Sequence, residues 1–213
     1  MQINTALPLE KLKEIEILES SEQLEDIKEN ENIILLKDHE FLIPKLRKNA
    51  VERLKLASGY LPLGHKLLVV TAFRPVGMQK RLWRNRLIQM AKAHPFMMMF
   101  QHRKWKKEVS KFTSPPGGSS HQYGGAVDVT VLDQNNNRLD MGTSLTDFGE
   151  KVKTHTNLIS EEQKINRKIL FDAMTKAGFV NYPNEWWHYS YGDRMWAAYS
   201  QEKSCIYGPL TIS

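Results

Sequence analysis

The sequence contains one cysteine, Cys205, and no apolar run long enough to cross a bilayer. A single cysteine excludes an intrachain disulfide and a cysteine-rich metal cluster. A membrane-spanning helix needs about 20 mainly apolar residues, so we expect the short apolar cluster at 96–100 to pack in the core instead. The first residues also lack the basic and apolar regions of a secretory signal. We therefore expect a cytoplasmic protein with no membrane partner; a periplasmic or secreted location is the alternative if a signal peptide has been removed.

The chain is modestly basic, with 30 Lys and Arg against 24 Asp and Glu and a net charge of +6. A basic balance raises the question of a nucleic-acid partner. Most of the basic residues, however, are interspersed with acidic ones, and the densest cluster is Arg103–Lys107. We interpret this cluster as a solvated surface segment, with a polyanion contact or a basic loop facing an active site as alternatives. No nucleic-acid partner is expected, and the sequence does not indicate an oligomeric state.

The pattern of apolar residues predicts one α+β domain. Residues 1–40 form a charged lead-in of unassigned structure, and residues 41–213 form the domain. An amphipathic helix is expected to start near Pro44 and to end at Gly59, with its apolar face formed by Leu46, Ala50, Leu54 and Ala57. A buried strand follows at 66–73. The helix after it is expected to turn Trp83, Leu87 and Met90 inward.

The second half of the chain predicts two more strands and one clear helix. A loop rich in Ser, Pro and Gly at 114–120 leads into a strand at 125–132. Ser160 and Gln163 have the spacing of a capping box at the start of a helix, and Gly178 is positioned to end it. The inward face of this helix is expected to carry Ile165, Ile169, Ala173 and Ala177. An aromatic segment at 185–191 is predicted to form the last strand.

Two residues around the second of these strands indicate a metal site. His121 lies at the mouth of a glycine-containing loop, and Asp128 lies seven residues later inside an apolar strand. A carboxylate flanked by Val127 and Val129 is costly to bury without a cation or several donors. Gly124 and Gly125 allow the backbone to bend so that both side chains reach one point.

The last strand supplies the remaining candidates, Glu185 and His188. Residues three apart face opposite sides of an ideal strand, so the two can cooperate only if Glu185 lies at a bend, for which Pro183 and Asn184 are suitable. Two histidines and an aspartate leave the fourth position of a zinc ion open, as in catalytic zinc sites. Taken singly, His121 is more simply a surface residue and His188 a core histidine; taken with Asp128, the metal site is the better hypothesis.

The same residues carry a family resemblance. The string Ser119-x-His121-x-x-Gly124-x-Ala126-x-Asp128, followed by Glu185-x-Trp187-His188, is similar to the signature of the D-alanyl-D-alanine metallopeptidases. The segments 73–75 and 141–143 resemble the dipeptidase branch of that family. The resemblance covers about residues 65–200, and it implies a small, mostly antiparallel central sheet flanked by helices, with the zinc site at the sheet, as in hedgehog-like folds.

The resemblance also implies roles for individual residues. His121, Asp128 and His188 would bind one zinc ion per chain, and Glu185 would be the general base and acid. Arg74 would hold the substrate carbonyl and the oxyanion formed from it, for which a fixed guanidinium is well suited. Ser119 would contact the substrate.

The expected function is zinc-dependent hydrolysis of D-alanyl-D-alanine or a similar D-amino-acid dipeptide in cell-wall precursor turnover. Such a small substrate predicts a confined cavity. Relatives carry an ammonium-binding aspartate where this chain has Thr146, with Asp147 one place later. A D,D- or L,D-carboxypeptidase acting on longer peptidoglycan stem peptides therefore stays open, as does a non-catalytic zinc-binding module of the same fold.

Overall fold

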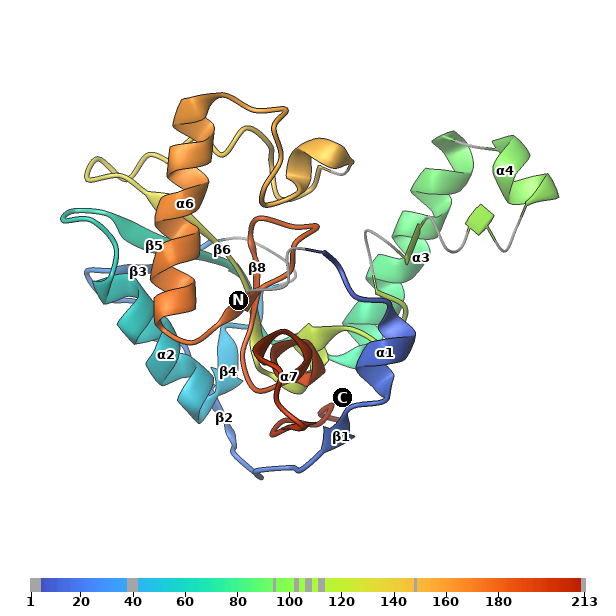
Figure 1. Ribbon diagram of the computed structural model, residues 1–213, viewed down its shortest axis with the longest axis horizontal. Helices are drawn as coiled ribbons and strands as arrows, with labels where there is room; N and C mark the ends of the chain where they lie inside the picture. The colour runs from blue at the N-terminus through green and yellow to red at the C-terminus, as the bar shows by residue number, and fades with distance from the viewer. Residues whose placement is uncertain are drawn as a thin grey trace.

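A five-stranded sheet forms the centre of the computed structural model (Figure 1), which describes residues 5–37, 42–93, 95–101, 104–105, 109–110, 114–147 and 149–211. The strand order is β3 (Ile33–Leu35), β5 (Lys66–Thr71), β6 (Ala126–Leu132), β8 (His188–Ser190) and β7 (Val180–Asn181). Within this sheet, only the β3–β5 pair is parallel. The predicted α+β class with a mostly antiparallel central sheet is confirmed.

Two helices, α2 (Lys48–Gly59) and α6 (Glu161–Lys176), pack against each other over this sheet (Figure 1). Their apolar residues join the main core with those of β5 and β6, and every residue of β6 is buried. A strand buried on both faces explains the near-continuous apolar run of its sequence.

The N-terminal part of the first helix prediction is wrong. Residues Lys45–Arg47 form strand β4, antiparallel to β2 (Leu24–Asp26), and α2 begins only at Lys48. The guanidinium of buried Arg47 donates to the carbonyl oxygens of Tyr123 and Gly208, and these long-range bonds hold the chain extended before the helix. Tertiary hydrogen bonds therefore override the local pattern here.

Helix α6 begins as predicted, and Ile169, Ala173 and Ala177 face the core as predicted, but Ile165 does not. Ser160 accepts from Gln163 N and Gln163 reaches back to Ser160 N, which confirms the capping box. Ile165 is nevertheless 60% exposed, and Arg167 is buried instead. The Arg167 guanidinium donates to the carbonyl oxygens of Met141, Lys151 and Lys153, so this cation sets the rotation of the helix.

The remaining short elements lie at the ends of the chain. Helix α1 (Leu9–Lys13) packs against α7 (Arg194–Ser200), and β1 (Glu16–Ile17) pairs in parallel with β9 (Ser204–Cys205). The residues before position 40 thus supply β3 to the central sheet and join the C-terminal elements. Among the described residues, no helix is both long and apolar enough to cross a membrane.

Helices α3 (Val76–Ala93) and α4 (Pro95–Phe100) project from the body as an arm (Figure 1). Trp83 and Leu87 turn inward with Met90, as predicted, but onto a separate small cluster with Trp105 and Val109. The prediction that 96–100 packs in the core is wrong, because α3 carries this segment away from the sheet. Within Arg103–Lys107, Lys104 is exposed and Trp105 is buried; the others lie outside the described residues.

Candidate metal centre and active-site cleft

Asp128 and His188 are brought together by strand pairing. They are directly opposite each other in the antiparallel β6–β8 pair, where opposed side chains share one face of the sheet. His121 comes from the 3-10 helix η1 (Ser120–Tyr123), just before β6. Gly124 follows with φ at 73°, and a Cβ on Gly125 would lie 2.0 Å from the carbonyl oxygen of Tyr191. The predicted need for glycine at this bend is therefore met.

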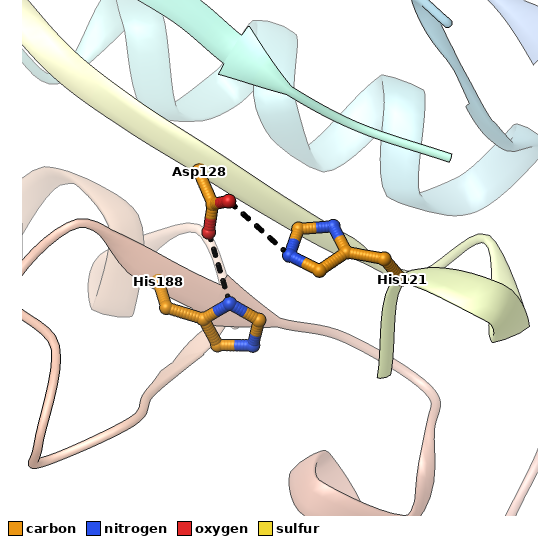
Figure 2. Close-up of side chains that lie close together, drawn as sticks. All are labelled: His121, Asp128 and His188. Atoms are coloured by element: carbon orange, nitrogen blue, oxygen red, sulfur yellow. Dashed lines mark hydrogen bonds and ion pairs between the residues drawn. The ribbon is translucent and has the colours of Figure 1, made fainter. Parts of the chain in front are cut away.

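Figure 2 shows the Asp128 carboxylate between the two imidazoles. Its Oδ1 lies 2.9 Å from His188 Nδ1, and its Oδ2 lies 3.3 Å from His121 Nε2. All three side chains are buried, and their candidate ligand atoms lie within 4.8 Å of one another. The spacing gathers two nitrogen ligands and one oxygen ligand around a common point.

The outer hydrogen bonds orient both imidazoles for metal binding. His121 Nδ1 lies 2.8 Å from the carbonyl oxygen of Ala72. Because a carbonyl only accepts, Nδ1 carries the proton and Nε2 keeps its lone pair toward Asp128. His188 Nε2 is 2.9 Å from Ser120 Oγ, which leaves Nδ1 on the side of Asp128. Ser120 was not singled out from the sequence, although its neighbour His121 was.

The electrostatics of the three residues also fit a metal site. Burial lowers the pKa of His121 to about 4, so this imidazole is neutral at physiological pH. Burial acts against ionisation of Asp128, but the two imidazoles outweigh it and hold the pKa of the carboxyl far below its usual range. Burial likewise opposes the charged form of His188, yet its hydrogen bond to Asp128 raises the pKa of the imidazole. A buried anion beside two nitrogen donors is the set that a divalent cation prefers.

Glu185 lies outside the strand, at the predicted bend. Its N–H donates to the carbonyl oxygen of Tyr182, and its own carbonyl accepts from His188 N, so the chain turns before β8 begins. The predicted strand at 185–191 is therefore shorter at its start. Burial raises the pKa of the Glu185 carboxyl to about 7, partly offset by His188, Arg74 and Arg86. A carboxylate with a pKa near neutrality is suited to accept and return a proton.

Arg74 follows the end of β5 and is fixed from several sides. Its backbone N–H donates to His121 O, its Nη1 donates to Gln79 Oε1 at 3.0 Å, and its Nη2 lies 3.8 Å from Asp128 Oδ2. Buried Gln79, which was not identified from the sequence, is itself held by donating to Ser114 O. The Arg74 Nε atom is buried without a hydrogen-bond partner. Arg74 lines the cleft, so its guanidinium is placed to donate to an oxygen of a bound ligand.

The site residues line one cleft of about 1740 Å³. Its walls come from α1, α3, the 114–121 loop and the turn that precedes β8. Ligand pockets for small molecules are usually about 300–1,000 Å³. The prediction of a confined cavity is therefore wrong, because the arm and the N-terminal segment enclose space beyond the metal ligands.

Ser119 and Asp147 both line this cleft. Ser119 is buried next to Ser120 and His121. Asp147 is exposed, and its Oδ2 accepts from Ser144 N at 2.8 Å. One carboxylate oxygen of Asp147 is therefore occupied in shaping its own loop.

Two imidazoles, a carboxylate, a half-buried glutamate and a fixed arginine in one cleft define a hydrolase that depends on a metal ion. The chain belongs to the D-Ala-D-Ala dipeptidase family, a family of metallopeptidases, because the family model matches residues 42–207. The resemblance inferred from the motifs is confirmed.

Curated relatives are D-alanyl-D-alanine dipeptidases. The chain is 28% identical to the Escherichia coli protein over 145 residues, covering 68% of this chain and 65% of the relative. It is 34% identical to the Synechocystis protein over 96 residues, covering 40% of this chain and 37% of the relative. These alignments thus span less than two thirds of either relative.

Solved structures show a looser similarity. The LD-carboxypeptidase LdcB has a TM-score of 0.48 and 21% identity, covering 91% of this chain and 75% of that chain. VanYB in complex with D-alanine-D-alanine has a TM-score of 0.45 and 17% identity, covering 87% of this chain and 86% of that chain. The family assignment therefore rests on the sequence match and not on these superpositions.

Replacing Arg74 by lysine is expected to reduce kcat/KM by about 10²- to 10³-fold and to leave metal binding intact. A lysine keeps the charge but loses the planar pair of donors that Gln79 positions. Steady-state kinetics and metal analysis measure the two effects. Arg84→Lys, an exposed change on α3, is the matched control; equal turnover in the two variants would contradict the role of Arg74.

Proposed function

We propose that this protein hydrolyses the peptide bond of D-alanyl-D-alanine or a similar D-amino-acid dipeptide in cell-wall precursor turnover. The observation that carries the proposal is the convergence of His121, Asp128 and His188 in one cleft with Glu185 and Arg74, within a family of D-Ala-D-Ala dipeptidases. A binding module would need neither a general base nor an oxyanion donor, so a non-catalytic role fits these residues less well.

The proposed cofactor is one zinc ion, held by His121 Nε2, Asp128 and His188 Nδ1. Three ligands of this nitrogen and oxygen type leave room for water and substrate, which is the arrangement of catalytic zinc. When bound, zinc would polarise the scissile carbonyl and lower the pKa of a water molecule. The solved VanY structure that resembles this chain is described as a complex with Zn(II).

The chain's own residues supply the proton transfers and the charge stabilisation. Glu185 accepts a proton from the attacking water and returns it to the leaving amine. Arg74 donates hydrogen bonds to the oxygen that becomes negative during attack. Ser119 and Asp147 are the proposed contacts to the substrate, with Asp147 at its free ammonium group. We place this activity in the cytoplasm, where a single unpaired cysteine fits reducing conditions.

A second candidate function is cleavage of longer peptidoglycan stem peptides by a D,D- or L,D-carboxypeptidase activity. Two points favour it: the cleft is larger than a dipeptide needs, and the resemblance to the dipeptidase branch implies an ammonium-binding aspartate at the position where this chain has Thr146. A longer substrate would occupy the space along α1 and α3 and would have no free ammonium group near the scissile bond.

The test compares free D-Ala-D-Ala, N-acetyl-D-Ala-D-Ala and a stem pentapeptide as substrates of the zinc-loaded protein. A dipeptidase is expected to prefer the free dipeptide, and Asp147→Asn should then raise KM for that substrate by roughly tenfold through loss of a charged hydrogen bond. Preference for the blocked or longer peptide would replace the dipeptide assignment by the carboxypeptidase. Absence of turnover on all three would contradict both.

A further inference from the structure

The arm carries an exposed apolar tip that the proposed chemistry does not use. We define the arm as residues 76–107, of which 76–93, 95–101 and 104–105 are described. Phe96, Met99 and Phe100 of α4 are 75%, 65% and 72% exposed, and Met98 is 37% exposed. Contiguous exposed apolar side chains of this size mark an interaction surface more often than isolated ones do. The tip lies at the end of the arm, away from the sheet and its core (Figure 1).

The charge of the arm is of one sign. Residues 76–107 contain nine of the thirty Lys and Arg residues and none of the 24 Asp and Glu residues. The rest of the chain therefore has twenty-one basic and 24 acidic residues, so the net positive charge of the sequence comes from this segment. Exposed basic side chains run from its base to its tip: Lys80, Arg84, Lys92 and Lys104.

We propose that the arm docks the protein on the surface of an anionic lipid bilayer. The Phe and Met side chains of the tip would enter the region between headgroups and acyl chains, to which short amphipathic segments bind. The basic residues behind the tip would lie at the level of the anionic headgroups, where each contributes to attraction. The hydropathy of the sequence predicts no membrane partner because it registers spanning segments, whereas this contact is peripheral.

Other occupants fit the same surface less well. A second copy would bring an equally basic arm against this one, and the like charges would repel. A nucleic acid would satisfy the charge, but it offers no apolar phase for the exposed Phe and Met side chains of the tip. An anionic bilayer matches both the charge and the exposed apolar tip.

Docking through the arm would also orient the cleft. Trp83, Arg86 and Gln89 line the cleft from the same helix that leads to the tip. The end of the cleft beside Arg74, at the base of α3, would then lie up to the length of this helix from the tip, roughly 27 Å for 18 residues at 1.5 Å each. This proposal does not depend on the identity of the substrate.

The test is co-sedimentation of the whole protein with unilamellar vesicles. Vesicles of equal parts phosphatidylglycerol and phosphatidylcholine are expected to bind it, and pure phosphatidylcholine vesicles are not. Phe96→Ser with Phe100→Ser should weaken binding at least tenfold, roughly the effect of removing one buried apolar side chain. Removing three charges of the arm should weaken vesicle binding roughly 100-fold, at about fivefold per charge; the variant combines Lys80→Gln, Arg84→Gln and Lys92→Gln. Added salt should weaken it further.

Matched controls change the same chemistry elsewhere. Leu63→Ser with Leu158→Ser removes two other exposed apolar side chains, and Lys55→Gln with Lys151→Gln and Lys203→Gln removes three exposed charges outside the arm. Binding that these controls weaken as much as the arm variants would overturn the proposal. Absence of vesicle binding would also overturn it. That holds even if the tip is then found to mediate self-association, measured by sedimentation velocity, or binding to duplex DNA.

Discussion

Replacing Glu185 by glutamine is expected to lower kcat by about 10²- to 10⁴-fold, the usual contribution of a general base. Glutamine has nearly the same shape but cannot take the proton of the attacking water. Glu185 is not among the three residues that gather at the metal centre, so the variant should still bind metal. Steady-state assays with metal analysis of the same preparation measure both quantities.

The pH dependence gives an independent check on Glu185. Only the carboxylate form can act as a base, so activity is lost as pH falls through the pKa of this group. Burial raises that pKa from 4.5 to about 7, and a bound dication would lower it again. The acid limb of kcat/KM at saturating zinc is therefore expected between these values, and it should be absent from the residual activity of Glu185→Gln. Wild-type turnover in Glu185→Gln would contradict the role of Glu185 as the general base.

Replacing Asp128 by asparagine is expected to abolish activity and to weaken metal binding by well over 100-fold, more than the loss of an outer hydrogen bond to a ligand costs. The substitution removes the carboxylate that lies between the two imidazoles and faces the Arg74 guanidinium, so these groups lose their shared negative charge. Metal content and the zinc-dependent rise of the melting temperature measure this effect, because a ligand that binds only the folded state stabilises it.

Asp172→Asn provides the control for this change. It makes the same substitution on the exposed side of α6, where Asp172 pairs only with Lys168. Zinc should raise the melting temperature of this variant as it does for the wild type, and should leave that of Asp128→Asn unchanged. Full zinc binding by Asp128→Asn would show that the metal is held elsewhere.

Local sequence rules predicted the elements whose ends are set by their own residues. The capping box of Ser160 and Gln163 starts α6, and the valine-rich runs at 66–71 and 126–132 form the buried strands β5 and β6. The rules failed where distant groups decide the conformation. The hydrogen bonds of Arg47 hold residues 45–47 in strand β4, where a helix start was predicted. On α6, Arg167 is buried and Ile165 faces solvent. Buried cations of this kind leave no periodic signal in the sequence.

The motif residues were found from the sequence because their chemistry is unusual in its setting. An aspartate within a valine-rich strand, next to glycines and followed by Glu-Trp-Trp-His, is specific enough to name a family. The bend at Pro183 and Asn184 was also predictable, since proline and asparagine favour turns. Gln79 and Ser120, which orient Arg74 and His188, were not, because polar residues that act through another side chain have no sequence signature.

The sequence by itself thus determined the α+β class, the candidate ligands and base, and the family. Only the tertiary structure decided how these residues meet: the β6–β8 register sets Asp128 opposite His188, and a cleft wider than a dipeptide opens beside them. It also turned the segment 96–100 from an expected core segment into an exposed tip. The physical reason is that composition and spacing fix which groups are available, whereas strand register and long-range hydrogen bonds fix which of them share a space.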